Sequence, residues 1–199
     1  MSVDHKNYPF SDSILRLNNQ FNRELADQFS GILPKGHIYN LGYPSEILLS
    51  VGFPKYPIEL SSTRLFEKSI QDNHPYKILD VKNIVLSLQS PLAIFSYGDK
   101  DKAKNIIVEL THKSKCFLVG MFITCCREVD IISVRGLFPK DTAEWLNWIV
   151  QGKALYLNKQ KIQTLIDQQR INLADVAYLD LNLVESLLET FMNPSSLQI

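Results

Sequence analysis

Two groups of side chains in this sequence could act on an anionic substrate, and the first surrounds His74. This residue follows the expected end of a helix and precedes Pro75, which stiffens the backbone. The pKa of an unperturbed histidine is about 6.5, so an imidazole can give or take a proton near neutral pH. The alternative role for His74 is a hydrogen bond to the helix end. Lys68 could add positive charge beside it, although a lysine on a helix is more often a plain surface residue.

The second group is Ser133 and Arg135, which flank Val134 in an expected strand. Alternate residues of a strand point to the same face, so both side chains should lie together. A guanidinium pairs bidentately with phosphate, and the pair therefore predicts a phosphate-binding site. The alternative is the ordinary polar face of an amphipathic strand. Thr111, at the end of another expected strand, is a weaker candidate for the same site.

The remaining histidines and cysteines do not form a recognisable metal or cofactor site. We expect His37 and His112 to be solvated loop residues. Cys116, Cys125 and Cys126 have no CxxC spacing and no histidine at a zinc-binding distance in the sequence, so we expect buried, reduced thiols. The chain has no P-loop and no GxGxxG motif. We therefore expect neither a bound metal nor a nucleotide cofactor.

The elements that must position these residues centre on four consecutive apolar runs. They are rich in β-branched and aromatic residues, and short polar gaps separate them. Such gaps favour an antiparallel meander, because parallel strands need a crossover of about a dozen residues or more. The runs are Leu92–Tyr97, Lys104–Thr111, Cys116–Thr124 and Val129–Val134. The predicted fold class is α+β: a single domain with a central, mainly antiparallel sheet, the meander spanning about 92–134, flanked by helices on its N- and C-terminal sides.

Capping residues and apolar periodicity predict helices on both sides of the meander. Ser11 or Asp12 begins a helix that reaches about Ser30, and further helices follow Ser45, Ser61, Asp80, Asp141, Asn158 and Asn182. Ala154–Leu157 reads as a short strand at a sheet edge. We divide the chain into an N-terminal helical segment (1–36), a core α+β domain (37–165) and an acidic, helical C-terminal appendage (166–199) that packs on the core.

Composition excludes several classes of protein. The 199 residues include 21 Lys and Arg and 21 Asp and Glu, so no strongly basic balance announces a nucleic-acid partner. No apolar run approaches the ~20 residues of a membrane span, and the start does not read as a signal peptide. We expect a soluble protein of the reducing cytoplasm, and export without a cleavable signal peptide stays open.

Five motifs occur in a fixed order along the middle of the chain. They are Leu41–Gly52, then Pro57–Ile58 with Leu65–Lys68 and His74, then Ile84–Phe95, Ile132–Val134, and Gly152–Lys159. In this order they resemble the C-terminal domain of phage Mu F-like head-morphogenesis proteins and of polymorphic toxins. That domain is grouped with barnase, EndoU, colicin-nuclease and RelE-like RNases. The resemblance covers about Tyr39 to Leu165.

The resemblance implies a metal-independent ribonuclease of phage or mobile-element origin, with RNA as its partner and an immunity or regulatory protein as a further one. His74 would act as general acid or base and Arg135 would hold the phosphate. Ser133 would orient the substrate, and Lys68 would add charge stabilisation. The alternative is a catalytically inactive relative that serves as a phage-derived accessory or protein-interaction module, with Trp145 and Trp148 on its partner surface. The sequence does not predict the oligomeric state.

The C-terminal stretch provides the first testable prediction. Residues 171–199 contain four acids and no Lys or Arg, together with many large apolar residues, among them Leu173, Val176, Tyr178, Leu181, Leu183, Val184, Leu187, Leu188 and Phe191. This apolar content predicts packing on the domain or on a second copy, and the charge suggests that the stretch covers basic surface. Deleting residues from Asn172 onward should lower the unfolding free energy or raise RNA affinity, measured by urea titration and by binding. A soluble, equally stable monomer with unchanged RNA affinity would refute both roles.

Overall fold

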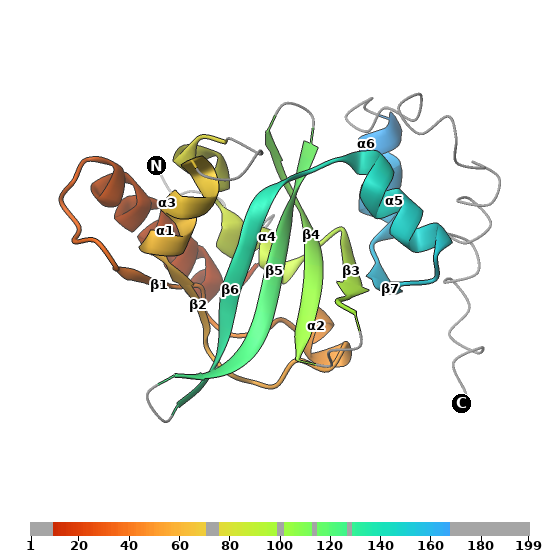
Figure 1. Cartoon of the computed structure of the whole chain (residues 1–199), viewed down its shortest axis with the longest axis horizontal. Coiled ribbons are helices and arrows are strands. Elements are labelled where there is room, and N and C mark those ends of the chain that lie inside the picture. The colour runs from red at the N-terminus through yellow and green to blue at the C-terminus, as the bar shows by residue number, and fades with distance from the viewer. Residues whose placement is uncertain (1–9, 71–75, 99–101, 113–114, 127–128, 168–199) are drawn as a thin grey trace.

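A computed structural model describes residues 10–70, 76–98, 102–112, 115–126 and 129–167. These residues form one seven-stranded sheet with helices on both faces, in the strand order β1-β2-β6-β5-β4-β3-β7 (Figure 1). The strands are β1 (Ile38–Asn40), β2 (Ile58–Ser61), β3 (Ala93–Ser96), β4 (Ala103–His112), β5 (Lys115–Cys126), β6 (Val129–Lys140) and β7 (Ala154–Leu157). The helices are α1 (Asp12–Phe29), α2 (Glu46–Ser50), α3 (Ser62–Ile70), the 3-10 helix η2 (Ile78–Val81), α4 (Ile84–Gln89), α5 (Thr142–Val150) and α6 (Lys159–Asp167).

The predicted meander is confirmed. The antiparallel pairs β3–β4, β4–β5 and β5–β6 join the four strands in sequence order, and β7 pairs with β3 at the sheet edge. The α+β fold class is likewise confirmed. Sequence analysis ended the last strand at Val134, whereas β6 continues to Lys140 and carries the chain across to α5. Sequence analysis also missed β1 and β2, and the latter pairs parallel with β6, placing Ile58 opposite Ile132.

The structure moves the helix start expected at Asp80 and keeps the one expected at Asp141. The carboxylate of Asp80 accepts a hydrogen bond from the Lys77 backbone amide at 2.9 Å, which closes a 3-10 turn rather than starting a longer helix. The helix then starts afresh at Ile84, after Asn83. At Asp141 the α5 helix begins as expected, but its side chain makes no capping hydrogen bond. The long helix α1 matches its prediction, with the Ser11 hydroxyl accepting from the Ile14 amide.

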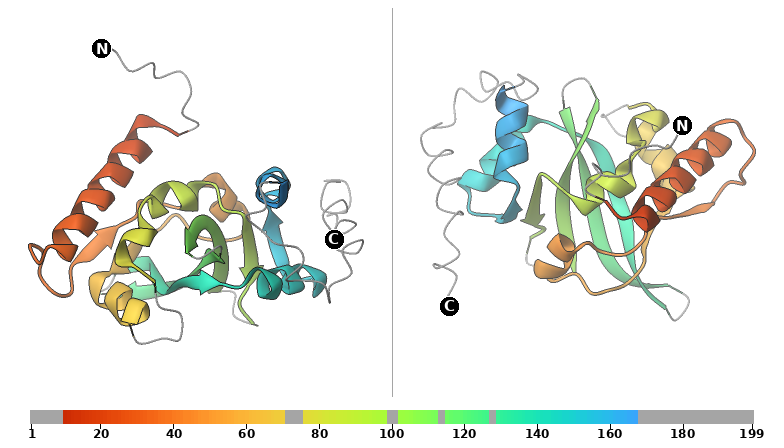
Figure 2. Two further views of the ribbon diagram at one scale, coloured as in Figure 1. Left: turned by 90° about the horizontal axis from the view of Figure 1, so that it is seen from above. Right: turned by 180° about the vertical axis from the view of Figure 1, so that it is seen from behind.

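The two faces of the sheet carry separate apolar cores. One face, here called the α1 face, packs β4, β5 and β6 against α1 and α4 through residues such as Phe21, Val85, Val119 and Ile132. The other, the α5 face, packs β3, β4 and β5 against α5 and α6 through residues that include Trp145. Figure 2 shows α1 and α4 on one side of the sheet and α5 on the other. Because Phe21 and Leu25 are fully buried in the first core, α1 belongs to the domain rather than to an appendage.

Asn83 fastens α1 to the start of α4. Its side-chain oxygen accepts from the amides of Asn18 and Asn22 at 2.9 and 2.8 Å, and its backbone amide donates to the Asn22 side chain at 3.0 Å. The residue has φ 66°, the left-handed region that asparagine tolerates better than most residues. One asparagine thus supplies both the turn geometry and the hydrogen bonds of this junction.

We predict that Asn83→Ala lowers the unfolding free energy by about 2–4 kcal/mol, since it loses two hydrogen bonds and leaves a β-carbon in the left-handed region. Asn83→Gly loses the same hydrogen bonds but accepts the backbone conformation, so it should cost about 1–2 kcal/mol less than alanine. Urea unfolding of wild type and the two variants measures both contributions, that of the hydrogen bonds and that of the backbone conformation. Equal stability of the alanine and glycine variants would show that the backbone conformation contributes nothing.

Candidate functional site

Arg135 is presented by a β-bulge in the longest ladder of the sheet. Gly136 lies opposite Gly120 and Val134 lies opposite Met121, so Arg135 has no residue opposite it on β5. A bulge adds one residue to one strand and re-aims the side chains around it. The bulge accounts for the burial pattern of β6, in which Val134 and Leu137 face the same core although three positions separate them.

The guanidinium of Arg135 lies against the α5 face of the sheet. Its carbon is 5.2 Å from the centre of the Phe122 ring, and its terminal nitrogen donates to the Thr124 hydroxyl at 3.3 Å. Ser133 stands directly opposite Phe122 in the ladder, so Ser133 and Arg135 share one face, the geometry that the strand spacing indicated. Arg135 is exposed and Ser133 is half-buried, so both can be reached from solvent.

Around Arg135 the α5 face has no helix over it. Figure 1 shows β4, β5 and β6 with no helix in front of them, while α5 lies to one side, near β3 and β7. We call this area the open face. It contains a shallow hollow of about 340 Å³ lined by Asn105, Leu118 and a set of aromatic, basic and glycine residues: Tyr97, Gly120, Phe122, Arg135, Gly136, Phe138, Lys140 and Trp148. Aromatic rings and basic side chains therefore lie side by side on a part of the sheet that no described helix covers.

Lys140 is the second cation of the open face and is more constrained than Arg135. Its ammonium forms an ion pair with Glu144 and lies 5.2 Å from the centre of the Trp148 ring. Burial lowers the pKa of Lys140, while the neighbouring Asp141 carboxylate acts in the opposite direction. Arg135 is thus the more accessible of these two cations, since its contacts are one hydroxyl and one ring.

The other predicted site residues are not brought to this face by what the structure describes. His74 lies outside the described residues, as do the side chains of Lys68 and Thr111. Tyr76, two positions after His74, is buried on the α1 face, where its ring packs 5.1 Å from that of Phe117 and its hydroxyl donates to the Leu65 carbonyl. The roles of His74, Lys68, Ser133 and Arg135 stay predictions.

Sequence analysis missed the aromatic members of the open face. Tyr97 and Phe122 were counted only as strand formers, yet their rings meet at 5.4 Å in an edge-to-face contact beside Arg135. The signal that could have found Phe122 is its strand parity: Gly120, Phe122 and Thr124 alternate along one face of β5. Pairing that face with Ser133 and Arg135 requires the register, which the sequence alone does not contain.

Two expectations for single residues need correction. His37 is not a solvated loop residue: it pairs with Glu24 at 3.1 Å and packs edge-to-face on Tyr39. Among the cysteines, Cys116 is buried as expected but Cys125 is exposed: it lies near the end of β5 opposite the exposed residue Asp130, beyond the last residues of the core. The side chains of His112 and Cys126 lie outside the described ones.

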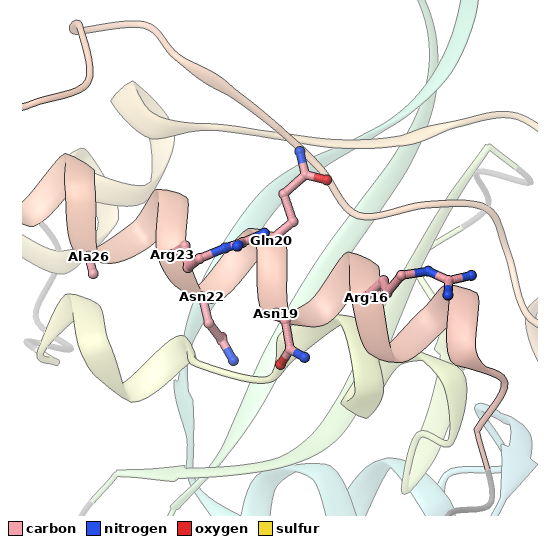
Figure 3. Close-up of a pocket in the computed structure, with 6 residues that line it drawn as sticks. All are labelled: Arg16, Asn19, Gln20, Asn22, Arg23 and Ala26. Atoms are coloured by element: carbon pink, nitrogen blue, oxygen red, sulfur yellow. The ribbon is translucent and has the colours of Figure 1, made fainter.

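The outer side of α1 forms a second polar surface, shown in Figure 3. Arg16 and Arg23 project from it two turns apart, with Asn19 and Gln20 between them. These side chains come from one helix, and Gln20 already donates to Glu24 at 2.7 Å. We interpret this surface as the solvated face of an amphipathic helix.

Metal and membrane features can be assessed only over the described ranges. There, no group of three or more His, Cys, Asp or Glu residues is arranged to hold a metal ion. No helix in that part of the chain is long and apolar enough to cross a bilayer.

Tyr39 generates a prediction about alkaline stability. Its side chain is fully buried, its hydroxyl has no hydrogen-bond partner among the described residues, and burial, with a smaller contribution from Glu24, raises its pKa from 10.0 to about 12. The unfolded chain therefore releases this proton first, and the unfolding free energy should fall as the pH rises from about 10 to about 12. Tyr39→Phe should reduce that fall without loss of stability at neutral pH, whereas exposed Tyr43→Phe should change neither. Urea unfolding across this pH range measures the slope, and identical slopes for all three proteins would contradict the assignment.

Comparison with known proteins finds a family model that matches part of this chain. Residues 66–164 match the model of the phage MuF C-terminal domain. No curated protein and no solved structure matches the chain. The matched segment begins within α3 and ends within α6, so it contains the meander and Arg135, whereas the Leu41–Gly52 motif lies outside it. Residues 66–164, just under half of the chain, are therefore similar to the phage MuF C-terminal domain that the ordered motifs also resemble.

Proposed function

We propose that this protein is a metal-independent ribonuclease of the phage or polymorphic-toxin type that holds RNA on its open face. Arg135 carries the proposal. The bulge sets its guanidinium on an uncovered sheet surface, on the same face as the Ser133 hydroxyl and against the Phe122 ring. A cation next to aromatic rings suits a ligand that combines phosphates with flat bases.

Cleavage of RNA without a metal requires a base for the 2′-hydroxyl proton, a cation for the crowded phosphate and an acid for the leaving oxygen. Arg135 supplies the cation, because a guanidinium stays charged and can bond two phosphate oxygens at once. Ser133 orients the same phosphate. His74 supplies proton transfer and Lys68 adds charge, and both enter the proposal through the family resemblance alone. Their variants are therefore tested separately from those of the open face.

Affinity for RNA must come from the local arrangement of cations and rings on the open face rather than from the net charge of the chain. The whole chain has no net charge, so long-range attraction of a polyanion is weak. Arg135 and Lys140 lie on the open face together with four aromatic rings: Tyr97, Phe122, Phe138 and Trp148. Stacking on such rings is sequence-tolerant and does not depend on net charge.

The alternative function is that of a catalytically inactive relative acting as a protein-interaction or phage-derived accessory module. Trp145 and Trp148 would have been the centre of its partner surface. Trp145 is fully buried in the core of the α5 face, and Trp148 is half-buried against Phe95 at 5.3 Å. This pair does not form an exposed apolar patch, so the alternative loses the feature that favoured it.

The decisive assay incubates total RNA with purified protein in excess chelator. His74→Ala should cut about 10²–10⁴-fold more slowly, the usual contribution of a proton-transfer residue. Arg135→Ala should lose about 10²–10³-fold, and Arg135→Lys should recover part of that loss because charge returns without the bidentate geometry. Arg16→Ala removes the same charge from the solvated face of α1 and should leave the rate unchanged.

Each other result has a definite meaning. Equal cleavage by wild type and His74→Ala would remove His74 from the mechanism. Equal loss in Arg16→Ala and Arg135→Ala would reduce the role of Arg135 to general charge. Absence of cleavage by folded wild-type protein would favour the inactive relative.

A further inference from the structure

The hollow in the open face exists because two glycines face each other across β5 and β6. Gly120 and Gly136 are directly opposed, and a β-carbon on Gly120 would lie 3.3 Å from the Gly136 backbone nitrogen. Neither residue contributes a side chain, so the sheet backbone itself is the floor. The rings of Phe122 and Phe138 stand on neighbouring positions of the same face and form its sides.

Tyr97 forms the outer wall of this hollow. Its side chain is 43% exposed, and its ring meets the Phe122 ring at 5.4 Å and 69°. The Arg135 guanidinium lies 5.2 Å from the centre of that Phe122 ring. A large, rigid aromatic surface is thus accessible next to a cation. Contiguous exposed aromatic surface often marks a ligand-binding groove, and these rings do not belong to the buried core. We therefore assign them a ligand-binding role.

The floor also offers one polar group. Asn105 is opposite Gly120 on β4, and its side-chain oxygen lies 3.6 Å from the position that a Gly120 β-carbon would take. A side-chain amide presents a donor and an acceptor together, the combination that complements the edge of a nucleobase. Aromatic walls with one amide in the floor form a small site for a flat, polar-edged ring.

We infer that this hollow receives an unpaired base, so that the nucleic-acid substrate is single-stranded RNA rather than duplex. The inference rests on the proposed function and specifies its substrate class. A volume of about 340 Å³ is at the lower end of ligand sites, which suits one base better than a larger ligand. The phosphate next to that base meets Arg135.

Duplex RNA cannot use the hollow. In an A-form helix the faces of the bases are stacked on each other, and only phosphates, riboses and groove edges are accessible. A base must be unstacked before it can pack against Tyr97. The open face should therefore select loops, bulges and free ends.

Binding of 2′-O-methyl oligonucleotides tests the inference independently of cleavage, because these strands lack the 2′-hydroxyl nucleophile. Fluorescence anisotropy compares a strand of about eight nucleotides with the duplex of the same sequence. We expect wild type to bind the single strand at least about 10-fold more tightly. Tyr97→Ala should lose about 5- to 150-fold for the single strand, the range for loss of one stacked base, with little change for the duplex.

Two controls make the result specific. Tyr97→Phe keeps the ring and should bind within about 2-fold of wild type. Tyr43→Ala removes an exposed tyrosine, 55% accessible, that does not line the hollow, and it should also leave binding unchanged. Circular dichroism confirms that each variant folds.

The possible negative results distinguish the inference about single-stranded RNA from the proposed ribonuclease activity. Equal affinity for single strand and duplex, or equal effects of Tyr97→Ala and Tyr43→Ala, overturns the inference even if the wild type cleaves RNA. Binding of neither form overturns it as well. Tyr97-dependent binding of single strands by a protein that never cleaves RNA supports the inference and refutes the ribonuclease.

Discussion

The antiparallel pairing of β5 with β6, interrupted by one bulge, determines the arrangement of nearly everything else in the domain. A strand alternates its side chains between two faces, so one extra residue exchanges the faces of all residues beyond it. Ile132 and Val134 face the α1 core before the bulge, and Leu137 faces the same core after it. Without the extra residue, Leu137 would point to the opposite face and the α1 core would lose this buried side chain. The bulge that preserves the core is also what leaves Arg135 outside it.

The helices cover the two faces unequally, and this inequality separates stability from binding. On the α1 face, α1, α4 and η2 contribute fully buried residues such as Leu25 and Val81 to one large core. On the α5 face the helical cover is limited to the end near Cys116 and Leu118. The remaining surface keeps half-exposed rings in contact with cations, as Phe122 with Arg135 and Trp148 with Lys140. The RNA strand that we propose as the ligand would therefore lie on this surface without displacing any described helix.

Local sequence signals predicted the parts of this structure that local interactions determine. Short polar gaps between apolar runs were sufficient for the meander, and Ser11 with its apolar stripe was sufficient for α1. The parallel pairing of β2 with β6 was not predictable in this way, since no local pattern joins Ile58 to Ile132. Sequence parity placed Ser133 and Arg135 on one face, but their neighbours Phe122 and Tyr97 depend on the register between strands. Asp80 failed as a helix cap because a 3-10 turn satisfied the same carboxylate sooner.

From the parallel contact between β2 and β6 we infer an order in which the strands of the sheet pair during folding. Hairpins such as β4–β5 and β5–β6 join residues that are close in the chain, so their loops close at small entropic cost. β2 must instead reach β6 across most of the domain, a contact of high sequence separation of the kind that slows folding. Until β2 arrives, the outer edge of β6 presents unpaired amides and carbonyls to any other extended chain. We therefore expect the short strands β1 and β2 to pair late and to cover an edge of β6 that the central hairpins leave open.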